Sequence, residues 1–376
     1  MNTLFLFGLF GGAEMVEGEP GVIIGPISMV LGGLVNFIYN MVASISTVGA
    51  FGISIIIVTI IFRSATLPFS IKQFRSSQKM AELQPEMKKI KDKYGDTKDP
   101  ELKRKMHMEM QELQRKNGVN MFASCLPMLL QMPIFIAMIY VMRQAFLFVT
   151  PITDVYTMLA NAIIALEWYA FEGAIMPIVW ERVPQAMWPE YFPRVAEDLI
   201  RLINVMGADN WAHVFDSITL SINEGVAYVS AQGYAELVRH PAYANAAQLA
   251  EIQRLHNEMV STVSFLGINL VAAPGLLNWP GALIPVTAAI TTFFQSKLMM
   301  ARSANADPTQ QGTQKMMMYA MPVMMGFFTI GIAAGVGLYW IAGNVYAIVQ
   351  QLIMNKYMKK PTPSVIDADA IADKKK

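Results

Sequence analysis

Apolar residues fall into five long runs, which are separated by polar or mixed segments. Each run is about 18 to 25 residues long, and an α-helix of that length can cross the hydrocarbon core of a bilayer. The pattern therefore predicts five transmembrane helices. They cover residues 48–71, 123–147, 279–298, 317–334 and 335–355, and the last two are joined by the glycine-rich turn AAGVG.

The segment before the first predicted span is harder to assign. Residues 23–47 are apolar, but their small residues, Gly and Pro favour an amphipathic helix that lies in the membrane interface over a sixth span. Residues 1–22 have an apolar stretch with no Lys or Arg before it, so they make a poor signal peptide. Whether this N-terminal segment is processed stays open.

Residues 72–121 are polar, with an apolar residue at every third or fourth position in two stretches. That spacing is typical of amphipathic helices, and the turn-forming run YGDTKDP separates the two. We therefore predict a hairpin of two antiparallel helices with a basic outer face, because a solvated charged loop would not explain the apolar seam. The seam consists of Met80, Leu83, Met87 and Ile90 on the first helix and of Leu102, Met106, Met110 and Leu113 on the second.

Residues 150–258 are the least readable part of the chain. Two stretches look amphipathic and helical, so we predict an extra helical insertion between the second and third spans. Its aromatic residues allow two interpretations, a cluster at the membrane interface or the core of a small helical cap, and both stay open. These aromatic residues are Trp168, Tyr169, Trp180, Trp188, Tyr191 and Phe192.

Composition supports a membrane protein and gives no sign of catalysis. Only 15% of the residues are charged and 54% are hydrophobic, whereas a soluble domain has about 25% charged residues. The single cysteine, Cys125, excludes an internal disulfide and makes a cysteine-rich metal site implausible. No hydrolase, metalloprotease or phosphate-binding motif occurs, and the four His are scattered. We therefore predict no enzyme activity, no cofactor, no metal and no direct DNA binding.

Charge is distributed unevenly along the chain, and this predicts the orientation of the spans. Residues 67–121 carry 13 Lys and Arg against 8 Asp and Glu, whereas residues 1–62 carry three Glu and no basic residue. Because basic loops stay in the cytoplasm, the hairpin is predicted to be cytoplasmic and the N-terminus external. Residues 151–258, with 5 Arg against 13 acidic residues, are then external, and the loop 299–316 and the tail 356–376 are cytoplasmic.

One charge, Arg63, lies inside the first predicted span. It precedes the next charge, Lys72, by nine positions, or about 13 Å along a helix. Such a residue usually faces a protein interior or a water-filled cavity, although its side chain could also extend to the cytoplasmic interface. The predicted spans contain no Asp or Glu to pair with it, so Arg63 is a candidate site for an anion. Other polar residues of the spans are Thr59, Gln131, Thr287, Thr291, Thr292, Gln295, Asn344 and Gln350.

Several segments resemble the YidC/Oxa/Alb family of membrane-protein insertases. The resemblance covers about residues 20–150 and 263–358 and departs from the family at residues 151–258. No large domain precedes the core, so a Gram-positive-type bacterial version is implied. The resembling segments are FRSATLPFSIKQFRSSQKMAELQPEMKKIKDKYGD, GVNMFASCLPMLLQMPIFIAMIYVM, FLGINL, FFQSKL, MMMYAMPVMMGFF and GVGLYWIAGNVYAIVQQ.

The resemblance implies an all-α polytopic protein whose five transmembrane helices form a bundle with a hydrophilic groove. Such a protein inserts and folds nascent membrane proteins in the bacterial cytoplasmic membrane, alone or with the Sec translocon. Carried over to this sequence, the groove residues are Arg63, Thr59, Gln295 and Trp340. Further partners implied are the lipid bilayer, the signal recognition particle, its receptor and the ribosome.

Two other classes of function stay open on the residues alone. A non-catalytic assembly scaffold would use the hairpin and the insertion but would not need Arg63. A small-anion transporter would use a lone arginine, but the sequence shows no inverted repeat and no second charge deep inside a span for coupling.

Overall fold

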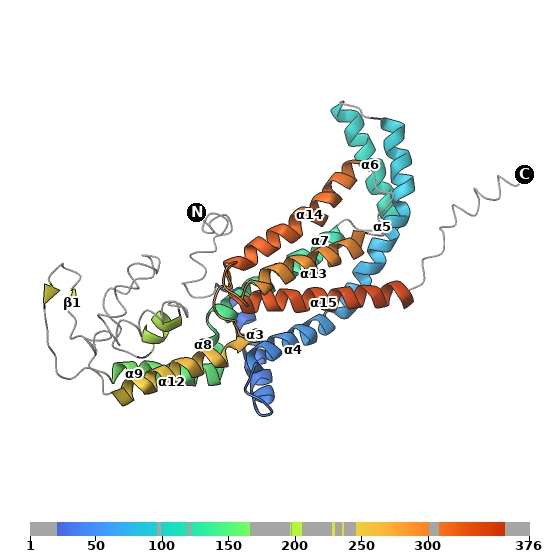
Figure 1. Ribbon diagram of the computed structural model, residues 1–376. Helices are drawn as coiled ribbons and strands as arrows, with labels where there is room; N and C mark the ends of the chain where they lie inside the picture. The colour runs from blue at the N-terminus through green and yellow to red at the C-terminus, as the bar shows by residue number, and fades with distance from the viewer. Residues whose placement is uncertain are drawn as a thin grey trace, which may run out of the picture. The chain divides into compact units, whose positions relative to one another are not determined.

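The computed structural model is predominantly α-helical (Figure 1). It describes residues 21–95, 99–118, 122–165, 196, 198–204, 228–229, 235–236, 246–300 and 308–357. The six aromatic residues of the insertion, the first 20 residues and the tail from residue 358 lie outside the described residues. The long helices are α3 (Ile24–Ala43), α4 (Ala50–Ala65), α5 (Leu67–Tyr94), α6 (Pro100–Lys116), α7 (Phe122–Arg143), α9 (Thr150–Ile164), α12 (Ala246–Thr262), α13 (Leu283–Met300), α14 (Pro308–Ile330) and α15 (Ala334–Tyr357).

The chain forms two compact units. Unit 1 comprises Met1–Val58, Ile136–Ala282 and Thr329–Val336, and unit 2 comprises Thr59–Phe135, Leu283–Phe328 and Gly337–Lys376. All four site residues predicted from the sequence belong to unit 2.

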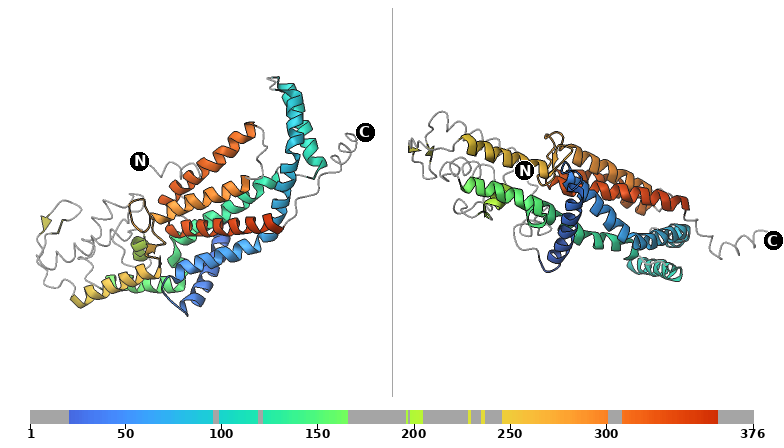
Figure 2. Two further views of the ribbon diagram at one scale, coloured as in Figure 1. Left: turned by 45° about the vertical axis from the view of Figure 1, so that its right-hand side comes forward. Right: turned by 90° about the horizontal axis from the view of Figure 1, so that it is seen from below.

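A hairpin of α5 and α6 forms one part of unit 2, and the two helices lie side by side in both views of Figure 2. Leu83 is buried in the seam, and Gln114 Nε2 lies 3.7 Å from Met87 Sδ across it. Glu109 of α6 accepts hydrogen bonds from Lys93 Nζ and Tyr94 Oη of α5, both at 2.8 Å. Of the other seam residues proposed from the sequence, six are partly buried and Leu102 is 38% exposed.

A break separates α4 from α5 within the stretch predicted as the first span. The two helices are bent by 59° at this break. The Thr66 hydroxyl donates to the carbonyl oxygens of Phe62 and Arg63. Pro68, the second residue of α5, has no N–H to donate. The apolar run from 48 to 71 is therefore not one straight helix.

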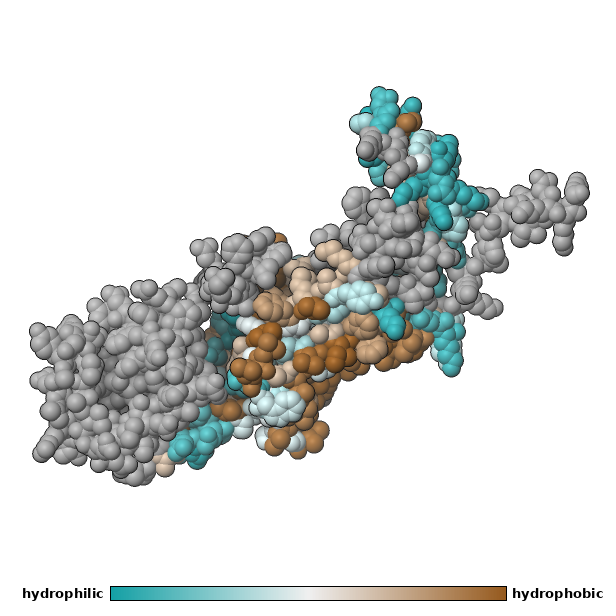
Figure 3. All heavy atoms as spheres, turned by 45° about the horizontal axis from the view of Figure 1, so that its top comes forward, coloured by the Kyte–Doolittle hydropathy of each residue, from teal (hydrophilic) through white to brown (hydrophobic). Residues whose placement is uncertain are grey.

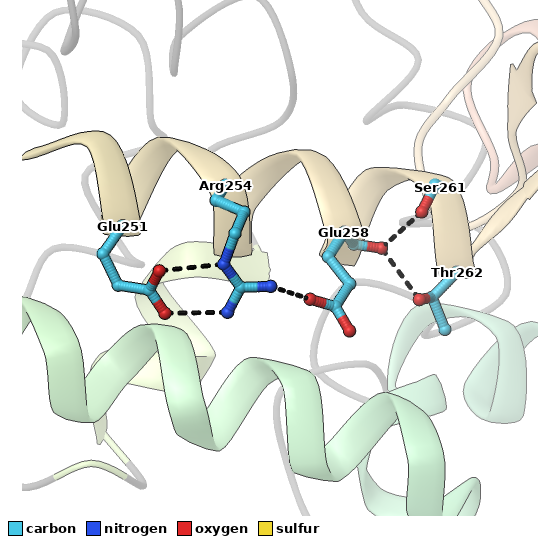
Figure 4. Close-up of polar contacts among 5 residues, drawn as sticks. All are labelled: Glu251, Arg254, Glu258, Ser261 and Thr262. Carbon is cyan, nitrogen blue, oxygen red and sulfur yellow. Dashed lines mark hydrogen bonds and ion pairs between the residues drawn. The ribbon is translucent and has the colours of Figure 1, made fainter.

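Helices α9 and α12 give unit 1 a core of its own. The buried face of α9 includes Ile152, Tyr156 and Leu159, and α12 buries Ile252 and Leu255. The opposite face of α12 is exposed and polar: Arg254 bridges Glu251 and Glu258 (Figure 4). The described part of residues 150–258 thus contains an amphipathic helix pair.

Short elements complete unit 1. The four-residue helix α8 (Ala145–Phe148) precedes α9, and β3 (Ser264–Phe265) pairs with β4 (Ile268–Asn269) directly after α12. Another two-stranded pair joins β1 (Tyr228–Val229) and β2 (Ala235–Glu236).

Two described helices, α3 and α15, are long and apolar enough to cross a membrane, and a third span results if α4 and α5 are taken together. Shorter apolar helices cover Gln131–Arg143 and Met318–Ile330. Exposed apolar side chains continue along α13, α14 and α15, whereas hydrophilic side chains gather over α5 and α6 (Figure 3). This arrangement fits an all-α membrane protein. The count of five spans and the interfacial position of α3 stay predictions.

Candidate functional site

Arg63 lies near the end of α4, where its side chain is half-buried. Its Nε is buried and has no hydrogen-bond partner among the residues that the structure describes. No ion pair involving Arg63 occurs in the described part of the chain either. Among the described residues, the guanidinium is therefore a partly desolvated cation without a counter-charge, which is an unfavourable state unless water or an anion reaches it.

The guanidinium of Arg63 packs against Gly343 of α15. A methyl group at Gly343 would lie 2.7 Å from Nη2, 3.3 Å from Nε and 3.4 Å from Cζ of Arg63. Such distances are shorter than van der Waals contact, so any side chain at Gly343 would displace the guanidinium. The missing side chain allows the charged group to lie directly on the backbone of α15.

Polar contacts on the same face of α15 lie on either side of Gly343. Tyr339, one turn earlier, accepts a 2.6 Å hydrogen bond at its hydroxyl from Gln131 Nε2 of α7. Tyr346, one turn later, pairs with the Ser64 hydroxyl of α4 at 3.1 Å. The spacing of four and three residues places Tyr339, Gly343 and Tyr346 on one helix face. Near Arg63, this face therefore contacts the end of α4 through Ser64 and the middle of α7 through Gln131.

A second polar cluster joins α13 to the adjacent face of α15. The indole Nε1 of Trp340 donates to Thr292 Oγ1 at 3.0 Å. In the amide orientation that pairs both of its ends, Asn344 donates to Gln295 Oε1 at 2.7 Å and its oxygen lies 2.9 Å from Thr292 Oγ1. The Trp340 ring also packs edge-on against Phe135, with centroids 5.4 Å apart. The cluster gives the buried amide and hydroxyl groups their hydrogen-bond partners inside an apolar bundle.

The structure places the four predicted site residues in different surroundings. Thr59 lies one turn before Arg63 on α4 and is fully buried, so it does not reach the molecular surface in this arrangement. Gln295 and Trp340 belong to the cluster between α13 and α15. Arg63 is connected to that cluster through α15, because Gly343 touches it and Asn344 is the next residue.

Sequence reasoning missed Tyr339, Gly343, Ser64 and Tyr346. A signal for three of them exists, since Tyr339, Gly343 and Tyr346 recur at helical spacing along the last apolar run. A glycine in such a run is usually attributed to helix packing, and the sequence does not say which helix lies opposite it. No group of three or more His, Cys, Asp or Glu side chains that could hold a metal occurs among the described residues.

Two ion pairs, Lys93–Glu109 and Lys116–Glu112, lie on the described part of the hairpin. The hydrogen bonds from Lys93 and Tyr94 hold the pKa of the Glu109 carboxyl below its usual range. The same contact raises the pKa of the Lys93 ammonium. These groups are exposed, so the pairing shapes the end of the hairpin more than it stabilises the protein.

The chain is similar in sequence to known membrane protein insertases. The chain is 25% identical to membrane protein insertase YidC 1 of Bacillus anthracis over 87% of this chain and 80% of that protein. It is 26% identical to membrane protein insertase YidC of Oceanobacillus iheyensis, over 86% of this chain and 81% of the relative. It is 27% identical to membrane protein insertase MisCA of Bacillus subtilis, over 83% of this chain and 74% of the relative.

The sequence profile of the family described as 60Kd inner membrane protein matches two stretches of the chain, residues 43–182 and 237–361. Together these stretches cover more than half of the 376 residues and include Arg63, Tyr339 and Gly343. The family resemblance seen in the sequence motifs is thereby confirmed, and the chain belongs to the 60Kd inner membrane protein family, that of the YidC insertases.

Proposed function

We propose that this protein inserts newly made membrane proteins into the bacterial cytoplasmic membrane, using Arg63 to receive an anionic group of the client. The relatives that it matches over most of its length are named membrane protein insertases. The observation that carries the role of Arg63 is its half-buried guanidinium, whose Nε has no hydrogen-bond partner among the described residues.

The physical basis is an uncompensated charge that a client can neutralise. A carboxylate about 4 Å from the guanidinium would gain about 4 kcal/mol at an effective dielectric constant of about 20, before desolvation is counted. This gain is available to a short acidic segment of a client that must leave the cytoplasm. Once the segment has crossed, solvation of the carboxylate in water favours its release. Arg63 can thus lower the barrier without ATP hydrolysis and without a covalent step.

The polar residues of unit 2 would line a hydrophilic groove around this charge. Gln131, Gln295 and Asn344 carry amides, and Trp340 is partly exposed, so its ring can contact apolar client segments. Thr59 is buried in the present arrangement and would contribute by packing behind Arg63. In this proposal the apolar helix of the client leaves the groove sideways into lipid, along the outer surfaces of the first, third and fifth spans.

The remaining parts of the chain would serve recognition and topology. The α5–α6 hairpin and the C-terminal tail would face the cytoplasm, and the N-terminus and residues 150–258 would face outward. The hairpin would meet the nascent chain first. The Sec translocon, the signal recognition particle with its receptor and the ribosome are proposed partners on the basis of the family alone.

The test is reconstitution of the purified protein into liposomes that contain no other protein. A single-spanning client with an acidic N-terminal segment is synthesised in their presence, and insertion is measured by protease protection of that segment. We expect protection with the native protein, its loss with Arg63→Ala and partial recovery with Arg63→Lys, because lysine restores the charge but not the planar donor set.

Protease protection equal to that of empty liposomes with the native, correctly folded protein would contradict the proposed function. Full protection with Arg63→Ala would contradict only the role of Arg63 and would leave insertion by another route in place.

A further inference from the structure

Unit 1 carries an exposed apolar patch on two neighbouring loops. We call it the loop patch. Its members and their exposed fractions are Leu266 (80%), Leu276 (57%), Leu277 (96%) and Trp279 (77%). The first lies in the turn between β3 and β4, and the others lie in the loop that follows β4. A methyl group at Gly267 would lie 3.5 Å from Pro280 Cγ, so the turn and the loop are adjacent.

The backbone at Leu266 makes its exposure more unusual. Leu266 has a φ of 52°, in the left-handed region that residues other than glycine, Asn and Asp rarely adopt. A turn in water would gain from Asn or Gly at this position, both in backbone strain and in solvation. A leucine there is favourable only if its side chain leaves water. The residue therefore indicates non-aqueous surroundings for this turn.

Backbone hydrogen bonds join the loop after β4, which carries three residues of the loop patch, to the beginning of α15. The N–H groups of Ala334 and Gly335 donate to the carbonyl oxygens of Ala272 and Leu270 at 2.8 and 2.7 Å. The N–H of Gly275 donates to the Ile330 carbonyl oxygen at the end of α14, at 3.3 Å. The first two N–H groups of α15, which have no partner within the helix, are satisfied in this way. The loop patch therefore lies next to the end of a helix that is long and apolar enough to span a bilayer.

The surrounding sequence contains nothing that would keep the loop patch out of a membrane. Residues 259–296 include no Asp, Glu, Lys, Arg or His. Tryptophan combines a large apolar ring with one N–H donor and is enriched where the acyl chains meet the headgroups. A rigid, uncharged loop with two leucines and a tryptophan, next to the end of a span, fits this boundary better than it fits water.

We infer that the loop patch inserts into the boundary between headgroups and acyl chains of the bilayer and fixes the depth at which α15 begins. The partner of this surface is lipid, and the contact is independent of Arg63. Its purpose is mechanical, since a span that begins at a fixed depth carries Gly343 and the polar residues after it at a fixed depth too.

The experiment measures the surroundings of Trp279 in the full-length protein in liposomes of phosphatidylcholine and phosphatidylglycerol. The chain has six Trp, so the emission of Trp279 is taken as the difference between the native protein and Trp279→Phe. Phenylalanine keeps the patch apolar, and the position is exposed, so this variant should fold. Quenching is compared between lipids with a nitroxide near the headgroup, lipids with a nitroxide at the end of the acyl chain, and aqueous acrylamide.

We expect Trp279 to emit at shorter wavelength than tryptophan in water. We also expect its emission to be quenched most strongly by the nitroxide near the headgroup, which we call the shallow nitroxide. Quenching by acrylamide alone would place the loop patch in water and overturn the inference. Quenching by neither lipid nor acrylamide would also overturn it, because another protein segment would then cover the patch. As a test of cause, Leu277→Asp should reduce the quenching by the shallow nitroxide, and unchanged quenching would show that the patch does not hold the loop in lipid.

Discussion

Arg63 is kept in an apolar helix bundle with no carboxylate beside it in the described part of the chain. Placing an arginine at the centre of a span costs about 2.5–3.5 kcal/mol on insertion scales, so the surroundings must leave it some access to polar groups. Gly343 gives the guanidinium a surface free of side chains, and Tyr339 and Tyr346 place hydroxyl groups one turn before and after Gly343 on that face. Among the described residues, no carboxylate pairs with this half-buried charge, and we propose that a group from outside the chain does.

Gly343→Ala should therefore reduce the insertion of clients with acidic segments. The added methyl must push the guanidinium away. At an effective dielectric constant of about 20, moving a charge pair from about 4 Å to about 5 Å lowers the equilibrium constant for pairing about fourfold. Insertion is measured in the liposome assay, with Gly33→Ala as the control, because a methyl group at Gly33 meets nothing within 4 Å.

A double-mutant cycle separates this effect from general damage to α15. In an Arg63→Lys background there is no guanidinium for the methyl to meet, so Gly343→Ala should cost much less there. Equal losses in both backgrounds, or equal losses for acidic and neutral clients, would show that Gly343 matters only for helix packing.

The site was only partly predictable from single residues. Arg63 was found because a charge inside an apolar run has a high cost wherever the helix lies. Gly343 could not be assigned in the same way, since its role depends on which helix packs against α15. The hydrogen bonds of Trp340 and Gln295 likewise depend on the pairing of α13 with α15, which the sequence pattern does not specify.

At the scale of elements, close helix and loop packing in unit 1 depends on glycines that face phenylalanine rings. Gly32 of α3 lies against Phe148 of α8, and Gly52 of α4 lies against Phe265 of β3. In both pairs a methyl group would overlap the ring. The apolar runs predict these helices. They do not predict which helix positions the phenylalanine rings contact, because those rings belong to short connecting segments that have no periodic sequence pattern.

Gly52→Ala should consequently lower the free energy of unfolding, by about 1–3 kcal/mol, because overpacking forces the Phe265 ring or the backbone to move. Gly33→Ala, the same substitution in open space, should be neutral or stabilising by up to about 1 kcal/mol, since alanine favours the helix. The stabilities of both purified variants and of the native protein are compared by thermal unfolding in detergent. Equal stability of the two variants would contradict the packing role of Gly52.

The end of the α5–α6 hairpin should respond to acid. The pKa of Glu109 is lowered by its hydrogen bonds from Lys93 and Tyr94, so their contribution is present above the unfolded pKa of about 4.3 and is lost as the pH falls through the lower folded value. Distances between spin labels on the exposed faces of α5 and α6 should therefore broaden below about pH 4. Glu109→Gln should show the broad distribution at neutral pH, and a narrow, unchanged distribution in that variant would contradict this account.

For the whole molecule, the apolar runs and the low share of charged residues predicted a helical membrane protein, and the family match agrees. The break at Thr66 is marked in the sequence by Pro68 alone, because the residues directly on either side of Thr66 are apolar. The insertion at residues 150–258 stayed open for a different reason: amphipathic helices can cover a membrane or each other, and the two uses give the same pattern. In the described part, α9 and α12 bury their apolar faces against each other.

Arg63 is proposed to act on clients through its charge. The most direct measurement exchanges the two charges, using Arg63→Glu and a client whose acidic residues are replaced by lysines, in liposomes without a membrane potential. We predict that Arg63→Glu loses insertion of the acidic client and gains insertion of the lysine client, while the native protein shows the opposite preference. If Arg63→Glu impairs both clients equally although the protein remains folded, the charge of Arg63 does not select clients and the account is wrong.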